Sequence, residues 1–200
     1  MQNIKDNIRQ KLIEAGRMLV KEKGVDFLTA RKLSEASECS IGTIYNQFGN
    51  MDEFIAEQNC LTLKELEKKL NNSDYTSDSY CNINRMVEIF TDFVIENKEL
   101  WLLLYNFHLS KHEGALDRKY KKQLVKMLNY SARDFKNLFP ILKNKHRKIM
   151  REVLAFGIFG ISAMAAADMF EGLKNVNREN VCRIFADTFL AGVTLLDKEQ

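Results

Sequence analysis

The stretch IGTIYNQF holds four polar side chains that together could read DNA: Thr43, Tyr45, Asn46 and Gln47. Threonine, asparagine and glutamine carry short donors and acceptors of the kind that bond adenine or phosphate oxygens in a major groove. A tyrosine hydroxyl can bond a phosphate. Ile44 and Phe48 lie four positions apart, so burying them in a helix turns the polar side chains toward solvent. The pattern predicts either a DNA-reading helix or an ordinary helix with a polar surface.

Gly42 lies inside the same stretch, where a glycine needs a reason. In a helix it costs roughly 0.5 to 1 kcal/mol relative to alanine. One such reason is the close approach of the backbone to another molecule. Gly42 therefore favours the DNA-reading interpretation.

The residues just before this stretch predict another short helix and a tight turn. Thr29 is a capping type of residue at the start of the helical run Ala30 to Ser37. Glu38 and Cys39 make the turn, and Ser40 caps the helix that follows. The two helices form either a helix-turn-helix unit or a plain helical hairpin with a polar surface.

The flanking segments predict helices that would hold this unit in place. Apolar residues recur every three to four positions from residue 3 to 23, which is typical of an amphipathic helix. We expect that helix to pack over the next two, with Phe27 filling the gap between them. Asn50 and Glu53 form a capping box at the start of a long helix, residues 51–70.

The remainder of the chain also predicts helices, so the expected fold class is all-α. The sequence is 46% hydrophobic and contains one proline, which favours helices throughout. Residues 71–82 are polar and rich in turn-forming types, and they predict a loop. The helices expected after it cover residues 83–96, 99–110, 115–138 and 143–170, and a last one is capped by Asn177.

The segment from Ile8 to Phe54 resembles the DNA-binding domain of the TetR (tetracycline-repressor) family of bacterial transcriptional regulators. The matching residues occur in the order and at the spacing of that family: Gly24, Phe27, Thr29, Arg31, Ser40, Gly42, Thr43, Tyr45 and Phe48. Two positions depart from the family pattern. Met51 replaces a lysine that usually contacts phosphate, and Ile41 stands where a polar residue is frequent. We expect Ile41 to join the core, the alternative being contact with a thymine methyl group.

The resemblance implies two domains and a set of DNA contacts. Residues 1–50 would be an N-terminal three-helix helix-turn-helix DNA-binding domain, and residues 51–200 a C-terminal helical domain for ligand binding and dimerisation. Arg31 with Asn46 or Gln47 would contact bases, while Thr29, Thr43 and Tyr45 would hold phosphates. The complete predicted interface is Thr29, Ala30, Arg31, Ser40, Ile41, Gly42, Thr43, Tyr45, Asn46, Gln47 and Asn50.

The family also binds small, often apolar effectors in its second domain. Trp101, Tyr105 and His108 share a helix face and have polar tips on largely apolar bodies, as ligand cavities require. Core packing is the alternative role for each of them. The predicted effector pocket consists of Phe90, Phe93, Trp101, Tyr105, His108, Phe135, Phe156 and Phe159.

The last two helices are apolar enough to predict a subunit interface. Small residues on the first of them would let another helix approach closely, and in the TetR family this pair of helices forms a four-helix bundle with its twin. The alternative is that both helices form the core of the second domain. The predicted interface residues are Gly157, Gly160, Ala163, Ile184, Phe185 and Phe189.

Several other classes of protein find little support in the sequence. The net charge of +3 is too mild to indicate nucleic acid by itself, so the DNA prediction depends on the motif. His108 and His112 are spaced for a metal, but the glutamate of an HExxH site is missing and no metal is expected. The four cysteines form no CxxC pair, as suits a reducing cytoplasm. No phosphate loop or nucleophile motif appears, so neither an enzyme nor a cofactor is expected.

The apolar run Val153 to Ala167 is shorter than the roughly 18 to 20 residues of a membrane span, so no membrane is expected. The N-terminus lacks the apolar run of a signal peptide, and we expect a cytoplasmic protein. The resulting hypothesis is a homodimeric repressor that binds a palindromic DNA operator and is released by a small apolar effector. The alternative is a TetR-like nucleoid-associated or division-control protein without an effector.

Overall fold

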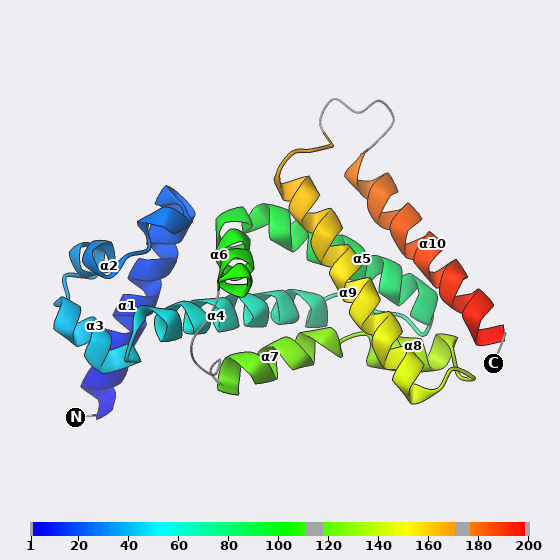
Figure 1. The fold of residues 1–200 in the computed structure, drawn as a ribbon, viewed down its shortest axis with the longest axis horizontal. Helices are drawn as coiled ribbons and strands as arrows, with labels where there is room; N and C mark the ends of the chain where they lie inside the picture. The colour runs from blue at the N-terminus through cyan, green and yellow to red at the C-terminus, as the bar shows by residue number, and fades with distance from the viewer. Residues whose placement is uncertain (1, 111–117, 171–176, 199–200) are drawn as a thin grey trace. The chain divides into compact units, whose positions relative to one another are not determined.

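The computed structural model describes residues 2–110, 118–170 and 177–198, and these contain helices and no strand. Figure 1 shows the order of the helices along the chain. Two compact units are present: unit 1 comprises Met1–Glu65 and Asn97–Leu124, and unit 2 comprises Leu66–Glu96 and Val125–Gln200. Unit 1 thus continues past residue 50, into the long helix. The assignment of DNA binding to residues 1–50 and of effector binding and dimerisation to residues 51–200 stays a prediction.

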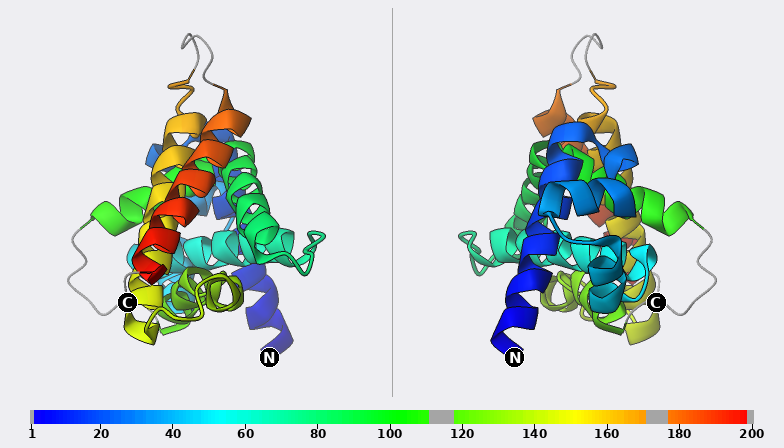
Figure 2. Two further views of the ribbon diagram at one scale, coloured as in Figure 1. Left: turned by 90° about the vertical axis from the view of Figure 1, so that its right-hand side faces the viewer. Right: turned by 90° about the vertical axis from the view of Figure 1, so that its left-hand side faces the viewer.

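Unit 1 is built around an amphipathic N-terminal helix. Its elements are α1 (Gln2–Lys23), the 3-10 turn η1 (Val25–Phe27), α2 (Ala30–Ser37), α3 (Ile41–Phe48), the first part of α4 (Met51–Asn71), α6 (Lys98–Leu109) and the start of α7 (Arg118–Leu128). One apolar core joins the helices α1, α2, α3, α4 and α6, and its buried members include Leu12, Val20, Leu33, Ile44, Phe54 and Leu100. Figure 2 shows α2 and α3 lying against α1 in the right-hand view. The core fixes the two short helices on a rigid support.

The loop after α1 contradicts one prediction. Gly24 has φ 92°, which only a glycine adopts easily, and its N–H donates to the Val20 carbonyl at 2.9 Å to end the helix. The 3-10 turn that follows leaves Phe27 46% exposed, while Leu28 is buried at 7% exposure. Leu28 therefore fills the place predicted for Phe27, because the turn rotates Phe27 toward solvent.

Unit 2 is a bundle around a buried central helix. Its elements are the end of α4, α5 (Ser79–Glu96), the end of α7, α8 (Ala132–Leu138), α9 (Asn144–Ala166) and α10 (Arg178–Lys198). Helix α5 packs against α8, α9 and α10, and α9 and α10 lie side by side (Figure 2). Large apolar side chains fill the space between them, including Ile83, Val87, Phe135, Leu154, Ile158 and Leu190.

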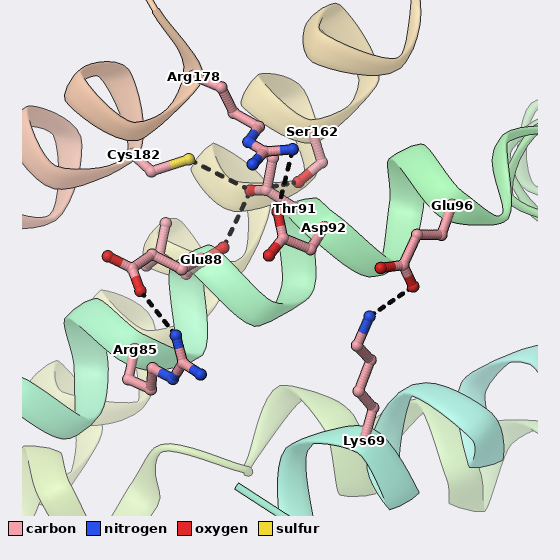
Figure 3. Close-up of polar contacts among 10 residues, drawn as sticks. Lys69, Arg85, Glu88, Thr91, Asp92, Glu96, Ser162, Arg178 and Cys182 are labelled. Carbon is pink, nitrogen blue, oxygen red and sulfur yellow. Dashed lines mark hydrogen bonds and ion pairs between the residues drawn. The ribbon is translucent and has the colours of Figure 1, made fainter. Parts of the chain in front are cut away.

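A small polar cluster lies inside this apolar bundle. Thr91 of α5 is fully buried and donates its hydroxyl to the Val87 carbonyl at 2.9 Å. Its Oγ1 is 3.1 Å from the Ser162 hydroxyl of α9 and 3.5 Å from the Cys182 thiol of α10, as Figure 3 shows. Since the Thr91 proton is committed to Val87, serine and cysteine donate to the threonine oxygen. One side chain therefore ties three helices together.

Some helix boundaries differ from those predicted. Helix α5 begins at Ser79, four residues earlier than expected, because Asp78 Oδ1 accepts the Tyr80 N–H at 2.8 Å and caps the helix. The single helix predicted over residues 115–138 is divided into α7 and α8. Residues 129–131 turn between them, with the Ala132 N–H bonded to the Asn129 carbonyl at 3.0 Å.

Helix α9 is long and apolar enough to cross a membrane by length and composition alone. It has 23 residues, and its most apolar 18-residue window has a mean hydropathy of 1.6. A core helix of a soluble protein passes the same test, so this is weak evidence for a membrane. The predicted apolar run of residues 153–167 is shorter than a membrane span, but the whole helix is not. The length of α9 therefore does not exclude a membrane.

Candidate nucleic-acid interface

Helix α2 and the turn after it have well-defined ends. The Thr29 hydroxyl accepts the Lys32 N–H at 3.2 Å, which confirms the predicted cap. Glu38 ends the helix in the left-handed conformation at φ 55°. The Ser37 hydroxyl is buried and donates to the Leu33 carbonyl at 2.6 Å. The chain is thereby turned sharply from α2 into α3, as the sequence predicts.

Helix α3 presents the predicted polar face. Ser40 Oγ accepts the Thr43 N–H at 3.0 Å and also bonds the Thr43 hydroxyl at 2.8 Å. Ile44 and Phe48 are buried at 0% and 3% exposure. Opposite them lie the exposed Tyr45 and Asn46 and the half-buried Gln47. This helix offers solvent the donors and acceptors that base edges and phosphates require.

The N-terminal turn of α3 contradicts the prediction for Ile41. Its side chain is 43% exposed and does not join the core. Ile41 begins the helix one turn before Ile44, at a point where the core beneath has ended. The thymine-methyl alternative remains a prediction for this side chain.

The environment of Gly42 shows no internal need for a glycine. A Cβ at this position would meet Ser40 Oγ at 3.7 Å, which is an ordinary contact. The backbone there is exposed and helical, so alanine would fit and stabilise the helix. Packing within the chain therefore does not account for the glycine, and the close approach of another molecule to the backbone stays a prediction.

Arg31 is held by an ion pair on the surface of α2. Its side chain is 84% exposed, and its Nε lies 3.2 Å from Glu35 Oε1, while Lys32 Nζ lies 2.8 Å from Glu35 Oε2. Hydrogen bonds from Lys32 and then Arg31 lower the pKa of the Glu35 carboxyl. The contact of Arg31 with DNA stays a prediction, and it would require this side chain to leave Glu35. Ala30, beside it, is half-buried.

The start of α4 confirms Asn50 as the helix cap, and Glu53 turns back to the Asn50 side-chain amide. Asn50 Oδ1 accepts the Glu53 N–H at 2.8 Å, and Asn50 Nδ2 lies 3.4 Å from Glu53 Oε1. Met51 is half-buried and packs against the core of unit 1. The side chain at this position therefore stabilises the core, where the family pattern has a phosphate-binding lysine.

Arg9 and Arg17 of α1 make long-range contacts that the sequence did not reveal, and only those of Arg9 reach α3. Arg9 contacts the end of α3 and Glu57 of α4, and Arg17 contacts Gln58, Thr62 and Glu65 of α4. Their partners lie 38 to 48 positions away in the chain. Helical periodicity carries no signal for contacts of that range.

The residues predicted to form an effector pocket are divided between the two units. Trp101, Tyr105 and His108 belong to unit 1, and the five phenylalanines belong to unit 2. Trp101 is buried, whereas Tyr105 is 40% exposed. His108 Nε2 lies 2.5 Å from the hydroxyl of the buried Tyr120. The burial of Trp101 supports the alternative role of core packing for that residue, whereas His108 is exposed and bonds Tyr120 from the surface.

The phenylalanines of unit 2 have three different environments. Phe93 and Phe135 are buried in the core, and Phe135 packs against Phe189 with ring centroids 6.3 Å apart. Phe90 and Phe159 are half-buried, and Phe90 lines a cavity of about 30 Å³. Phe156 is 68% exposed on the outward stripe of α9. Within this chain Phe156 therefore lines no enclosed space, and an effector pocket in unit 2 stays a prediction that rests on Phe90 and its neighbours.

The predicted interface residues divide between internal packing and the surface. A Cβ on Gly157 would lie 2.3 Å from the Phe185 ring, so Gly157 serves the contact of α9 with α10 inside the chain. A Cβ on Gly160 would meet nothing within 4 Å. Ile184 is 59% exposed, while Ala163, Phe185 and Phe189 are half-buried. Their role between subunits stays a prediction.

Metal binding has no support within the part of the chain that the structure describes. No group of three or more His, Cys, Asp or Glu side chains gathers there. His108 bonds Tyr120, and His112 lies outside the described residues. The cysteines at 39, 60, 81 and 182 are free thiols.

The fold and the exposed polar face of α3 define a class: an all-helical protein with an N-terminal helix-turn-helix domain. Residues 12–57 match the family model described as bacterial regulatory proteins, tetR family. This match identifies the N-terminal domain of the chain as a TetR-family DNA-binding domain. Regulators of this family are generally non-enzymatic, cytoplasmic proteins that bind DNA operators as dimers and respond to small molecules.

Solved structures share the fold along most of the chain. A protein of unknown function from Rhodococcus sp. RHA1 is 17% identical, with a TM-score of 0.74 over 92% of this chain and 94% of that one. A TetR variant from Acinetobacter baumannii AYE, in complex with minocycline, is 15% identical, with a TM-score of 0.61 over 93% and 96%. Thermus thermophilus FadR, a repressor in complex with lauroyl-CoA, is 15% identical, with a TM-score of 0.65 over 91% and 93%. No curated protein matches the sequence.

Proposed function

We propose that this protein is a cytoplasmic, homodimeric repressor whose α3 helices read a palindromic DNA operator. This proposal rests on the exposed polar face of α3. The helix is capped and is buried on its other face, and Gly42 leaves its backbone without a side chain at an exposed position. Such helices lie in successive major grooves of a dimer-bound site, about 34 to 36 Å apart. Arg31 with Asn46 or Gln47 contacts bases, and Thr29, Thr43 and Tyr45 hold phosphates.

The dimer uses the outward faces of α9 and α10. Apolar side chains on α9 recur at helical spacing and are at least 42% exposed: Ile149, Val153, Phe156 and Met164. On α10, Ile184 and Leu195 are exposed as well. Large exposed apolar patches mark interaction sites. A second copy of the same pair of helices would bury this surface and place two α3 helices in one assembly.

A small apolar effector acts through unit 2. The space around Phe90 is lined by apolar groups together with Arg151, and the Arg151 Nε has no hydrogen-bond partner. Since the cavity of about 30 Å³ is near the size of a water molecule, binding must widen it. An effector releases DNA only if it binds the released state more tightly.

A second candidate function is favoured by the same small cavity. Sites for drug-sized ligands usually occupy about 300 to 1,000 Å³, far more than this one. A TetR-like nucleoid-associated or division-control protein needs no such space. A gel-shift series with and without cell extract separates the two, because a repressor loses its operator when an effector is added.

The DNA roles are tested on duplexes that the purified protein selects from a random pool. Gln47→Ala should relax base preference by about 1 to 3 kcal/mol, because a base contact is lost. Tyr45→Phe should weaken binding to all sequences alike, because a phosphate contact is lost. Equal losses across sequences in both variants would refute this division of roles.

A further inference from the structure

Arg9 joins three helices of unit 1 at the end of the recognition helix. Its guanidinium carbon lies 4.2 Å from the centroid of the Phe48 ring. Nη1 donates to the Gln47 carbonyl at 2.5 Å, and Nη2 donates to the Glu57 carboxylate of α4. One side chain of α1 thus contacts both the last turn of α3 and the first half of α4.

These contacts match what the end of a helix requires. The last carbonyls of a helix have no partner within it and carry partial negative charge, which a cation stabilises. The planar guanidinium also lies over an aromatic ring, where a cation is attracted by the negative face. Glu57 balances the charge. Arg9 is only 33% exposed, so the arrangement is a built part of unit 1.

We propose that Arg9 is a positioning residue that sets sequence recognition by fixing the last turn of α3. This inference rests on the proposed reading of DNA by α3. Asn46 and Gln47, the residues proposed to contact bases, belong to the turn that Arg9 holds. A displacement of about 1 Å breaks the geometry of bidentate base contacts, while phosphate contacts tolerate it. Loss of Arg9 should therefore remove base discrimination more than affinity for DNA in general.

Arg17 provides a matched control on the same helix. Its Nη1 lies 3.2 Å from Thr62 Oγ1 and 3.3 Å from the Gln58 carbonyl, and its Nη2 lies 2.5 Å from Glu65. All of these partners belong to α4. Arg17 thus joins α1 to α4 as Arg9 does, through contacts that do not involve α3. A variant of Arg17 loses a comparable clamp without releasing the recognition helix.

The experiment measures the affinity of the whole protein for two duplexes. One is the duplex that the wild type selects from a random pool, and the other is a shuffled duplex of the same composition. Arg9→Ala should lower the ratio of the two affinities by about tenfold, through weaker binding of the selected duplex. Arg17→Ala should lower the melting temperature and leave the ratio within about twofold of wild type. A wild type without any preference would refute the proposed function itself, whereas preserved discrimination in Arg9→Ala would overturn only this inference.

Arg9→Lys and the salt dependence distinguish positioning from direct contact with phosphate. Lysine keeps the charge but cannot reproduce the planar fork and stack, so Arg9→Lys should lose discrimination as Arg9→Ala does. The slope of affinity against salt should stay at the wild-type value in both variants, since no phosphate contact is removed. A slope reduced by about one in Arg9→Ala, with full rescue by lysine, would overturn the proposal. If Arg9→Ala does not fold, Arg9→Lys decides the outcome.

Discussion

Gly16 of α1 lies directly against the Phe54 side chain of α4. A Cβ at this position would lie 2.5 Å from Phe54 Cζ and 2.9 Å from Cε1. The Phe54 ring is fully buried and cannot move aside without disturbing the core. Gly16→Ala should therefore lower the free energy of unfolding by about 1 to 3 kcal/mol. Urea denaturation followed by circular dichroism measures this, and an unchanged midpoint would contradict the close approach.

Gly42→Ala should have the opposite effect on stability from Gly16→Ala. The exposed helical position has room for a methyl group, so the substitution should raise stability by about 0.5 to 1 kcal/mol. The same methyl group should weaken binding of the selected duplex, because the backbone can no longer come as close to DNA. A thermal melt and a binding titration on one preparation measure both effects. Unchanged or tighter DNA binding would remove the reason proposed for this glycine.

The residues that could be predicted from sequence are those whose roles are set locally. Thr29 and Ser40 cap their helices because a hydroxyl and an N–H three residues later are enough to make the bond. The predictions for Ile41 and Phe27 were wrong, because their exposure depends on where the core ends and on how η1 rotates the chain. Arg9 was missed, because its partners are distant in sequence.

At the scale of the element, the start of α5 links a thiol to a carboxylate. Cys81 Sγ lies 3.2 Å from Asp78 Oδ2, and this hydrogen bond raises the pKa of the thiol and lowers that of the carboxyl. A raised thiol pKa means less thiolate at a given pH, and the thiolate is the nucleophile. Asp78→Asn should lower the Cys81 pKa toward its ordinary value, so alkylation by iodoacetamide between about pH 7 and 9 should be faster.

Asparagine is also a good helix cap, so this variant keeps the capped start of α5. Cys182 is the internal control: it is 2% exposed, burial raises its pKa, and it should stay unreactive until the protein is unfolded. Mass spectrometry of each cysteine follows both reactions. Equal rates for Cys81 in the wild type and in Asp78→Asn would contradict the bond.

The polar cluster at Thr91 allows a second prediction at the scale of the element. Thr91→Val keeps the shape but removes the oxygen that accepts from Ser162 and Cys182, both of which are buried. We expect a loss of about 1 to 2 kcal/mol in the free energy of unfolding, since a buried hydroxyl is left without its acceptor. The double variant Thr91→Val, Ser162→Ala should recover part of that loss. Chemical denaturation of the four proteins in the cycle tests this, and strict additivity would show that the two hydroxyls do not interact.

Most helices could be predicted because apolar periodicity and capping residues are local signals. The break between α7 and α8 could not, because residues 129–131 contain neither glycine nor proline, and the turn is set by packing. The division of the chain into its two compact units could not be predicted from the sequence either. Helix α6 follows α5 directly in sequence but belongs to unit 1, where Leu100 and Leu103 join the core around α1.

At the scale of the whole molecule, the proposed dimer depends on the exposed apolar stripe of α9. Phe156 is 68% exposed within this single chain, a large amount for a phenylalanine on a helix that is otherwise half-buried in a bundle. Phe156→Asp would place a charge at the centre of the proposed interface, where no partner charge is available. We expect the variant to be monomeric by size-exclusion chromatography with light scattering, and to keep its helical content.

Met18→Asp is the matched control, since Met18 is 58% exposed on α1 and has no place in the proposed interface. It should remain dimeric. In a dimer, binding of one α3 helix to its half-site places the second α3 helix at a high effective concentration near the other half-site. Phe156→Asp should therefore also lose affinity for the selected palindrome. Its affinity for a single half-site should equal that of Met18→Asp, because each α3 is unchanged. A dimeric Phe156→Asp, or a monomer that binds the palindrome as tightly as the control does, would show that α9 does not join the subunits.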